Sequence, residues 1–334
     1  GNILWTFKPE SQLWNFMPMF TGNGSVLFQD QVGGAYHLNL TSGKVIWHTG
    51  VRAGFEEYWT DGMSWLGPNG LFYAAHVHGT AVSMNATTPS HLRAYRVSDG
   101  EAVWRRDFPY PINSQPVVAT LREGESPSLV MCSGVQAALP LMIGVVFGTV
   151  AGLLLGALMA AVGLVTCLCS RKSLSRRACL RLAALPPGTA LLLAGVFVLL
   201  LDSAFRRKGG MPSEVQVLDA ATGDLRWHYA FPVWSGWAVR GDEEGVLPRL
   251  WHGSQPFCVP NGWGSPSVDA SGTVWLGHQN GLIYGLRDEN GDGRISEAEV
   301  STFDMGASST HFGGAYAAGV MAWASCDTVF VFRE

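Results

Sequence analysis

The stretch VQVLDAATGDLRWHYAF, residues 215–231, combines an alternating apolar pattern, a polar turn and a glycine, Gly223, that precedes Trp227 by four positions. The same order recurs in AYHLNLTSGKVIWHTG (35–50) and LRAYRVSDGEAVWRRDF (92–108), and GNILW at the start of the chain has the spacing of the tail of another copy. Alternation of apolar and polar side chains predicts half-buried strands. The sequence therefore contains a repeated strand–turn–strand unit.

The glycine–tryptophan units begin at Gly1, Gly43, Gly100 and Gly223. When the apolar block before the last unit is set aside, their spacing is roughly 50 residues, which is typical of a propeller blade. The glycine supplies the positive φ of a tight turn, and the tryptophan supplies a large apolar plate between adjacent sheets. This pattern predicts an all-β fold, a β-propeller of four-stranded blades with about five or six blades visible, interrupted by a helical hairpin.

The stretch GWGSPSVDASGTVWLGHQNGLIYGL, residues 262–286, resembles a repeat of the PQQ-type, or quinoprotein alcohol-dehydrogenase-like, β-propellers. The matching positions are Ser265, Pro266, Asp269, Gly272, Val274, Trp275, Gly277, Gly281, Tyr284 and Leu286, together with Leu218, Asp219, Thr222, Gly223 and Trp227 of the 215–231 copy. The resemblance covers most of the chain outside the apolar block. It implies propeller architecture and, on its own, no particular chemistry.

Two apolar blocks lie in the middle of the chain. Residues 136–170 contain no charged residue and exceed the roughly 20 residues that cross a bilayer, and residues 182–201 are just long enough. Together the blocks predict a two-span transmembrane hairpin at 135–203, between a first group of blades at 1–134 and a second group at 204–334. The lipid bilayer is therefore one expected partner.

The connector at 169–181 predicts the orientation of this hairpin. It carries five basic residues and no acidic one: Arg171, Lys172, Arg176, Arg177 and Arg181. Short basic loops stay in the cytoplasm, so both propeller parts are predicted to be lumenal or extracellular. Glycosylation sequons at Asn23, Asn39 and Asn85 agree with that assignment.

The first apolar block carries a stripe of glycines at every fourth position: Gly144, Gly148, Gly152 and Gly156. On a helix these glycines form one bare face that lets another helix approach closely, and Ala190 and Ala194 have the same spacing in the second block. We consider three roles for this glycine stripe: packing within the hairpin, packing between copies of the chain, or no special role. Pro186 and Pro187 are expected to mark the start of the second helix.

Residues 288–299, within RDENGDGRISEAE, match the template of a twelve-residue calcium loop. The predicted ligands are Asp288, Asn290, Asp292, the Arg294 carbonyl, Ser296 through a water and Glu299. Gly293 takes the sharp-turn position, and Ile295 is expected to turn inward. A strand leads into the loop where other repeats have an ordinary turn, so a structural calcium clip is favoured over an EF-hand sensor. The alternative is a solvated acidic turn.

Net charge and cysteine content narrow the class of function that a propeller of this kind could have. A net charge of −4 does not favour nucleic-acid binding. PQQ dehydrogenases often hold a Cys-Cys pair under the cofactor, and this sequence has none, so PQQ is not an expected cofactor. A binding or assembly scaffold with an unknown protein or peptide partner on the propeller face is the favoured function. A PQQ-dependent alcohol dehydrogenase-like oxidoreductase is the alternative.

Remaining cysteines and histidines give weaker hypotheses. Cys167, Cys169 and Cys179 would face the cytoplasm and are candidates for palmitoylation. Cys132, Cys258 and Cys326 would be lumenal and allow one disulfide with one thiol left over, in any of three pairings. His76 and His78 share one face of a predicted strand and are a candidate metal pair, although a polar face is the commoner reason for such spacing.

Overall fold

The structure, a computed structural model, describes residues 1–14, 16–49, 58–60, 63–78, 88–112, 114–135, 138–169, 176–207, 210–236, 238–255, 257–258, 262–309 and 313–333. The chain divides into two compact units, one made of Gly1–Gln136 with Met211–Glu334 and the other of Ala137–Gly210. The first unit holds the strands, and the second is a helical hairpin. The sequon at Asn85 lies outside the described residues.

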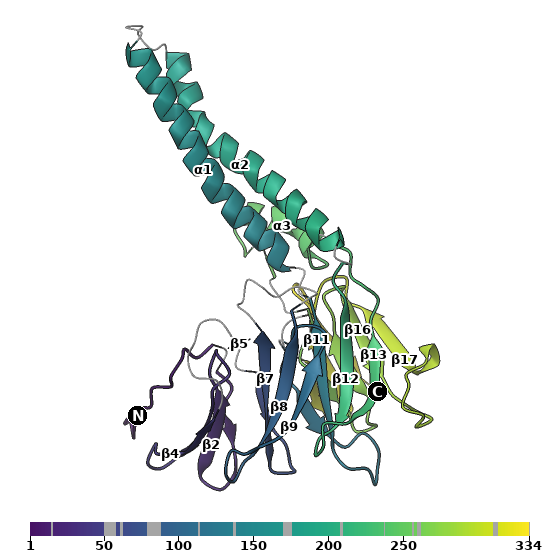
Figure 1. Ribbon diagram of the computed structural model, residues 1–334. Helices are drawn as coiled ribbons and strands as arrows, with labels where there is room; N and C mark the ends of the chain where they lie inside the picture. The colour runs from purple at the N-terminus through teal and green to yellow at the C-terminus, as the bar shows by residue number, and fades with distance from the viewer. Residues whose placement is uncertain are drawn as a thin grey trace. The chain divides into compact units, whose positions relative to one another are not determined.

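Among the described residues, the strands of the first unit form five antiparallel sheets. Figure 1 shows the course of these strands. Sheet 1 contains β1 (Met19–Phe20), β2 (Ser25–Gln29), β3 (Ala35–Asn39) and β4 (Val45–Thr49), and sheet 2 contains β5 (Tyr58–Trp59), β6 (Ser64–Leu66), β7 (Leu71–His78), β8 (Ser90–Arg96) and β9 (Ala102–Phe108). Sheet 3 contains β10 (Val117–Ala119), β11 (Ser128–Gly134), β12 (Ser213–Asp219) and β13 (Leu225–Ala230). Sheet 4 contains β14 (Ser267–Val268), β15 (Val274–Gly277), β16 (Leu282–Leu286) and β17 (Val300–Asp304), and sheet 5 contains β18 (Ala315–Ala317), β19 (Val320–Ala324) and β20 (Val329–Arg333).

The strands of each sheet follow one another along the chain, with β6 as an additional neighbour of β7 in sheet 2. The prediction of mainly antiparallel four-stranded sheets is therefore confirmed. Sheet 5 has three strands among the described residues. A short helix, α3 (Asp242–Trp251), lies between sheets 3 and 4 in sequence.

Consecutive sheets share apolar cores, which shows that they pack face to face in chain order. Leu27 and Trp47 of sheet 1 pack with Phe72 and Tyr95 of sheet 2. The other cores join sheet 2 to sheet 3, sheet 3 to sheet 4 and sheet 4 to sheet 5, through Leu92 with Met131, Val217 with Leu276, and Ile283 with Trp323. This order of packing is the one expected of successive propeller blades.

The repeated tryptophans carry part of this packing. Trp5, Trp47 and Trp104 donate Nε1–H to the carbonyl oxygens of Leu40, Val97 and Ala220, over 2.6, 2.7 and 3.2 Å. Each acceptor stands three residues before a turn glycine, respectively Gly43, Gly100 and Gly223, whose φ angles are +68°, +76° and +77°. Each indole also fills the space of a β-carbon on that glycine, at 2.6, 2.7 and 2.8 Å. At Trp47 and Trp104 this contact joins neighbouring sheets, and at Trp5 it joins the segment before β1 to sheet 1.

The helical hairpin enters and leaves the first unit in the middle of sheet 3. Strands β11 and β12, which flank it in sequence, are antiparallel partners from Ser128↔Asp219 to Gly134↔Ser213. The hairpin therefore takes the place of an ordinary turn between two paired strands. The predicted interruption of the blades falls inside one sheet rather than between two.

The hairpin consists of α1 (Ala138–Cys169) and α2 (Arg176–Arg207). The glycine stripe of α1 lies against α2: β-carbons on Gly148 and Gly152 would come within 2.4 Å of Ala194 Cα and 2.3 Å of Ala190 Cα. Thr189 Oγ1 also donates across the pair to the Gly152 carbonyl oxygen at 2.6 Å. The prediction that these small residues pack within the hairpin is confirmed.

Two expectations about the hairpin are wrong. Pro186 and Pro187 lie inside α2, which begins ten positions earlier at Arg176. Pro186 packs closely on Gly156 of α1, and α2 continues through both prolines although proline disfavours a helix interior. The connector predicted at 169–181 is also too long, because Arg176, Arg177 and Arg181 are helical. Arg171 and Lys172 lie outside the described residues.

Candidate functional site

The predicted calcium loop joins β16 to β17 in sheet 4. Leu286 pairs with Val300 at its base, and Arg287 N–H donates to the Glu299 carbonyl oxygen at 3.3 Å. In sheets 1 to 3 the corresponding connection is the short turn that receives a tryptophan. The predicted position of the loop is therefore confirmed: a strand leads in, and a single 3-10 turn, Glu297–Glu299, leads out.

The side chains near the start of the loop bind its own backbone. Asp288 accepts Gly291 N–H at 2.7 Å through Oδ1 and Gly293 N–H at 3.1 Å through Oδ2. Asn290 Oδ1 accepts Asp292 N–H at 2.9 Å, and Asp292 Oδ1 accepts the Arg294 N–H at 2.8 Å. These bonds curl the backbone around its own carboxylate and amide oxygens. Ile295 is partly buried and packs on the core between sheets 3 and 4, as predicted.

Ser296 and Glu299 form a capping box at the 3-10 turn. Glu299 Oε2 accepts the backbone N–H and the hydroxyl of Ser296 at 2.8 and 2.7 Å, and Oε1 accepts Glu289 N–H at 2.8 Å. Hydrogen bonds from Ser296, followed by the one from Glu289, lower the pKa of Glu299 to about 2. The carboxylate is thus charged at neutral pH and fixed over the loop.

The donor set of the loop consists of oxygen atoms, which suits Ca²⁺. However, within the described residues no group of three or more His, Cys, Asp and Glu side chains is placed to hold a metal ion. The carboxylates of Asp288, Asp292 and Glu299 bind backbone N–H groups instead of converging on one point. The chemistry of the loop fits calcium, and the calcium site stays a prediction.

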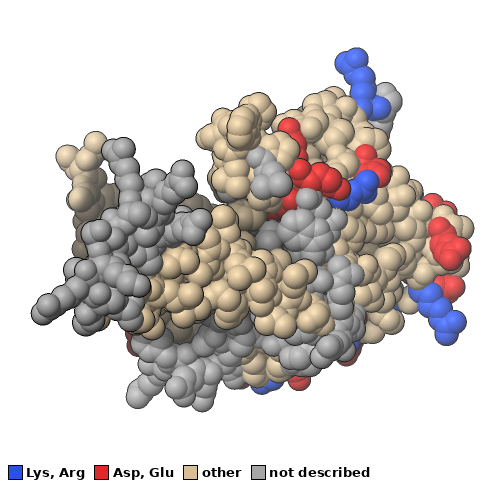
Figure 2. All heavy atoms as spheres, turned by 90° about the horizontal axis from the view of Figure 1, so that it is seen from above, with Lys and Arg blue, Asp and Glu red and all other residues tan. Residues whose placement is uncertain are grey.

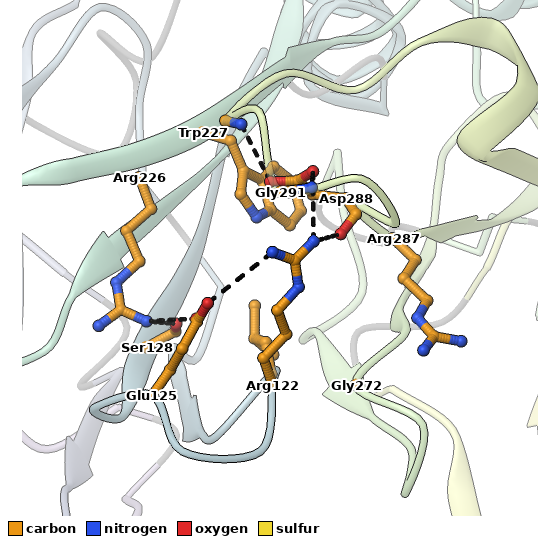
Figure 3. A pocket seen from close by; sticks show the side chains of 11 residues that line it. Arg122, Glu125, Ser128, Arg226, Trp227, Gly272, Arg287, Asp288 and Gly291 are labelled. Carbon is orange, nitrogen blue, oxygen red and sulfur yellow. Dashed lines mark hydrogen bonds and ion pairs between the residues drawn. The ribbon is translucent and has the colours of Figure 1, made fainter.

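A cavity of about 300 Å³ lies beside the loop, between sheets 3 and 4. Its lining includes Arg122, Glu125, Arg226, Trp227, Arg287 and Asp288 (Figure 3). Trp227 is the fourth tryptophan of the repeat, and it faces the calcium loop where the first three face a turn glycine. A β-carbon on Gly293 would lie 3.0 Å from the Arg226 carbonyl oxygen, so the loop also approaches the backbone of β13 closely.

Arg122 is the residue of this site that sequence analysis did not identify. It lies in the turn between β10 and β11 and donates through Nη2 to the Asp288 carbonyl oxygen. Its Nη2 also lies 3.5 Å from Asp288 Oδ1, and its Nη1 lies 3.9 Å from Glu125 Oε1. No local motif marks Arg122, because the contact joins positions far apart in the sequence.

Arg226 lines the cavity from sheet 3 and contacts several polar side chains there. It forms an ion pair with Asp219 at 2.7 Å and donates to Ser126 and Ser128. Burial alone would raise the pKa of Asp219, but hydrogen bonds from Arg226 and Ser126 lower it to about 2. Asp219 belongs to the turn that receives Trp104, so one arginine links that turn to the cavity.

The histidines predicted as a metal pair, His76 and His78, lie on β7 and both contact His91 on β8. His78 Nε2 lies 3.1 Å from Nδ1 of His91 on β8, whereas His76 stacks on the His91 ring with centroids 4.7 Å apart. His76 is buried under the Gly33 turn, and burial, aided by Arg93, lowers its pKa to about 3. Sequence spacing identified one strand of this cluster and missed His91 on its neighbour.

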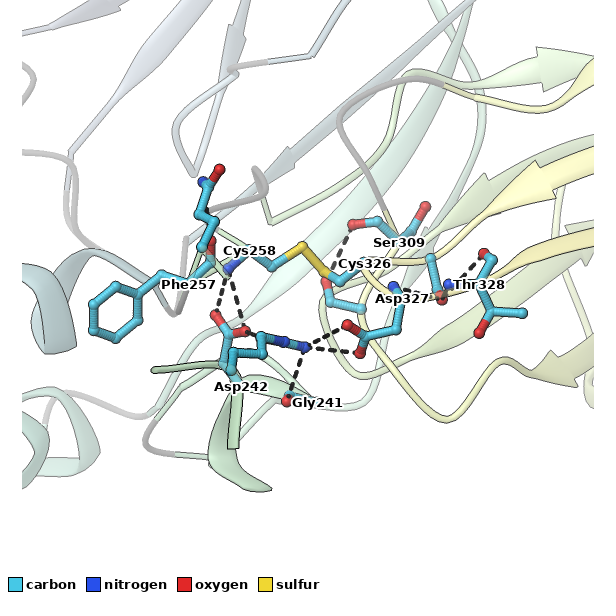
Figure 4. The surroundings of a disulfide bond; sticks show 12 residues. Gly241, Asp242, Phe257, Cys258, Ser309, Cys326, Asp327 and Thr328 are labelled. Atoms are coloured by element: carbon cyan, nitrogen blue, oxygen red, sulfur yellow. Dashed lines mark hydrogen bonds and ion pairs between the residues drawn. A yellow bond between two sulfur atoms is a disulfide. The ribbon is translucent and has the colours of Figure 1, made fainter. Parts of the chain in front are cut away.

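The structure selects one of the three disulfide pairings. Cys258 and Cys326 are joined, with Cα atoms 5.6 Å apart (Figure 4). Cys132 is a buried free thiol. The disulfide ties the segment after α3 to sheet 5. Asp242 supports it by accepting Cys258 N–H at 3.0 Å. Arg249 lies between Asp242 and Asp327, with its Nη2 2.7 Å from Asp327 Oδ2.

No model of a known protein family matches this chain, and no curated protein matches it. Among solved structures it is similar to BamB from Moraxella catarrhalis, with a TM-score of 0.48 and 12% identity over 99% of this chain and 63% of that one. It is also similar to quinohemoprotein alcohol dehydrogenase from Comamonas testosteroni (TM-score 0.47, 13% identity, 97% and 42% of the two chains) and to a europium-containing methanol dehydrogenase (0.44, 11%, 90% and 45%).

These solved structures are β-propeller proteins. This chain spans less than two thirds of the length of each of them. At such identities and TM-scores the similarity assigns neither a family nor an activity.

Proposed function

We propose that this protein is a membrane-anchored, propeller-like scaffold that binds a polypeptide partner and carries a structural calcium clip. The observation that carries the proposal is the apolar hairpin inserted between two paired strands of sheet 3. Its outward side chains include Leu154 and Leu191, which are 68% and 78% exposed. In Figure 2 the charged side chains of the face seen from above gather toward one side of it. An apolar surface of this extent is expected to be covered by lipid.

Helix length supports two spans. Each helix has 32 residues and is therefore about 48 Å long, which exceeds the roughly 30 Å hydrocarbon core of a bilayer. Within α1 the stretch Phe147–Val165 is long and apolar enough to cross a membrane, whereas the apolar stretch of α2, Leu185–Leu200, is shorter. Because α2 packs closely on the glycine stripe of α1, it would span the membrane together with α1.

The disulfide supports the predicted orientation. Disulfides persist in oxidising compartments and are rare in the cytosol, so Cys258–Cys326 favours a lumenal or extracellular position for the sheets. The sequon residue Asn23 lies between β1 and β2 of sheet 1, and Asn39 is the last residue of β3. The basic connector would then face the cytoplasm.

A protease-protection experiment tests the anchor. In sealed microsomes, a cleavable tag inserted at Ser175 is expected to be cut without detergent, while the sheets stay protected.

Glycosidase treatment is expected to shift the mass of the chain, and Asn23→Gln with Asn39→Gln is expected to reduce that shift. Cleavage at Ser175 only after detergent would overturn the orientation, and extraction of the chain by carbonate would overturn the anchor.

A groove of about 600 Å³ between sheets 4 and 5 is the surface we propose for the partner. Apolar side chains dominate its lining, among them Trp275, Ile283, Phe303, Met321 and Phe332. Strand β20 beside it pairs with β19 and with no second strand among the described residues. An extended polypeptide with alternating apolar residues would pair with β20 and place those residues in the groove.

Peptide binding to the detergent-solubilised chain tests this surface. A labelled peptide of alternating valine and threonine is expected to bind better than its scrambled form, as measured by fluorescence anisotropy. Met321→Glu, in the groove, is expected to weaken binding at least tenfold. Val103→Glu is the matched control, because Val103 lies on β9, is 43% exposed and belongs neither to the groove nor to β20. Equal effects of the two variants would contradict the assignment.

The calcium loop would act as a clip between sheets 3 and 4. Asp288, Asn290, Asp292, the Arg294 carbonyl and Glu299 would bind one Ca²⁺, with Ser296 acting through water. An unpaired loop is expected to bind weakly, with a Kd on the order of 10⁻⁴–10⁻³ M, as in extracellular modules. At ten times Kd, binding to the folded state alone stabilises the fold by about 1.4 kcal/mol.

Calcium is therefore expected to raise the melting temperature of the chain. Glu299→Gln and Asp288→Ala should abolish this rise, because each removes a carboxylate ligand. Glu289→Gln should retain it, since the Glu289 side chain is exposed and only its backbone N–H contacts Glu299. A melting curve that ignores both calcium and chelator, together with no heat of calcium binding, would show that the loop is an acidic turn.

A further inference from the structure

Residues 3–7 have the contacts of the last strand of a sheet. Their central residue, Trp5, packs on the Gly43 turn of sheet 1. Trp47 and Trp104 pack in the same way on the sheet that follows theirs, and each is the third residue of the last strand of its own sheet, β4 or β9. Residues 3–7 nevertheless pair with no strand among the described residues.

Sheet 5 has the opposite arrangement, an edge without a last strand. In sheets 1 to 4 a further strand pairs with β3, β8, β12 and β16, whereas β20 pairs with β19 alone among the described strands. One face of β20 presents Val329 and Val331, which are 69% and 67% exposed. On the other face, Phe330 and Phe332 pack on the core shared by sheets 4 and 5. The exposed face of β20 is therefore apolar and faces away from sheet 4.

The last strand pairs in the same register in sheets 1, 2 and 3. Its tryptophan lies opposite the residue two positions before the end of the preceding strand. These pairs are His37↔Trp47, Ala94↔Trp104 and Val217↔Trp227. The same register on β20 places Trp5 opposite Val331, and Phe7 opposite Val329. Residues opposite each other share one face of a sheet, so these aromatic side chains would cover the exposed valines.

The same register also gives the groove between sheets 4 and 5 an occupant. In sheets 1 to 3 a register shift places the residue two before the tryptophan opposite the residue after the tryptophan's partner. Ile3 would therefore lie opposite Phe332, which lines the groove. Ile3 is 82% exposed where it lies on sheet 1. Residues 3–7 read ILWTF, a run rich in strand-forming side chains.

We propose that residues 3–7 of a second copy of this chain are the polypeptide that binds the edge of β20. This inference rests on the proposed peptide-binding groove and names its occupant. Within one copy the described apolar cores join the sheets in the order 1 to 5, and residues 3–7 lie on sheet 1, at the other end of that order from β20. A second copy brings its residues 3–7 to β20 and leaves these cores intact. The donor and acceptor surfaces differ, so the contact is heterologous and can repeat from copy to copy.

Sedimentation of the whole chain in detergent tests the contact. The unaltered chain is expected to associate as its concentration rises. Ile3→Asp and Val331→Asp should each weaken this association by about tenfold or more, because each places a charge inside the new strand pair. Both side chains are exposed in a single copy, so these changes leave its fold intact. Val103→Asp is the matched control, since Val103 is an exposed valine of β9, outside both surfaces.

Cysteine cross-linking tests the register and the identity of the partner. Thr6 would lie opposite Phe330, so Thr6→Cys and Phe330→Cys in two differently tagged copies should form a disulfide on oxidation. Thr6→Cys with Val331→Cys should cross-link far less, because Val331 points to the other face of β20. Oxidation of the unaltered chain gives the background from the native cysteines. A cross-link that forms only within a copy carrying both changes would show that the chain closes on itself, and would overturn the second copy as partner.

The outcomes separate this inference from the proposed groove. An unaltered chain that stays monomeric, or one that associates equally after Ile3→Asp and Val331→Asp, overturns the inference. If the alternating valine–threonine peptide still binds, and Met321→Glu still weakens its binding, the groove keeps its proposed role. If that peptide fails to bind even the Ile3→Asp chain, whose own residues 3–7 no longer compete for β20, the groove is overturned as well.

Discussion

The packing of an indole against the turn glycine of the next sheet is the contact on which the rest of the first unit depends. It occurs at Trp5, Trp47 and Trp104, and each time the indole N–H donates to the carbonyl oxygen three residues before the glycine. The contact fixes both the spacing and the register of neighbouring sheets, because the hydrogen bond is directional and the ring occupies the space of a β-carbon. The shared apolar cores then form between sheets that are already aligned.

The fourth tryptophan shows what changes when the turn is replaced. Trp227 meets a twelve-residue loop instead of a glycine turn, and a cavity opens between sheets 3 and 4. Polar contacts there take over part of the role of the indole: Arg122 reaches Asp288, and Arg226 binds Asp219. At this position ion pairs replace the neutral indole–glycine contact. The strength of those ion pairs depends on the ions in solution. The calcium clip proposed above would lie at this position.

Features that repeat at short spacing were predictable from the sequence, and features that join distant positions were not. The glycine–tryptophan units predicted the sheets, and the glycine stripe predicted the close packing of α1 on α2. By contrast, Arg122, His91 and the Cys258–Cys326 pair depend on which strands become neighbours, and no local pattern records that. Pro186 and Pro187 predicted a helix start at the wrong place, because α2 begins at Arg176 and continues through both prolines.

The central claim is that the turn glycines are required by the tryptophans and not only by their positive φ angles. Gly100 and Gly70 separate the two effects, since their φ values are +76° and +74°, yet a β-carbon would meet Trp47 at 2.7 Å on Gly100 and nothing within 4 Å on Gly70. Alanine at either position costs about 1–2 kcal/mol for the backbone alone. Urea unfolding of the whole chain in detergent is expected to show that Gly100→Ala loses a further ~1–3 kcal/mol, because the indole is displaced. Equal losses in the two variants would contradict the account.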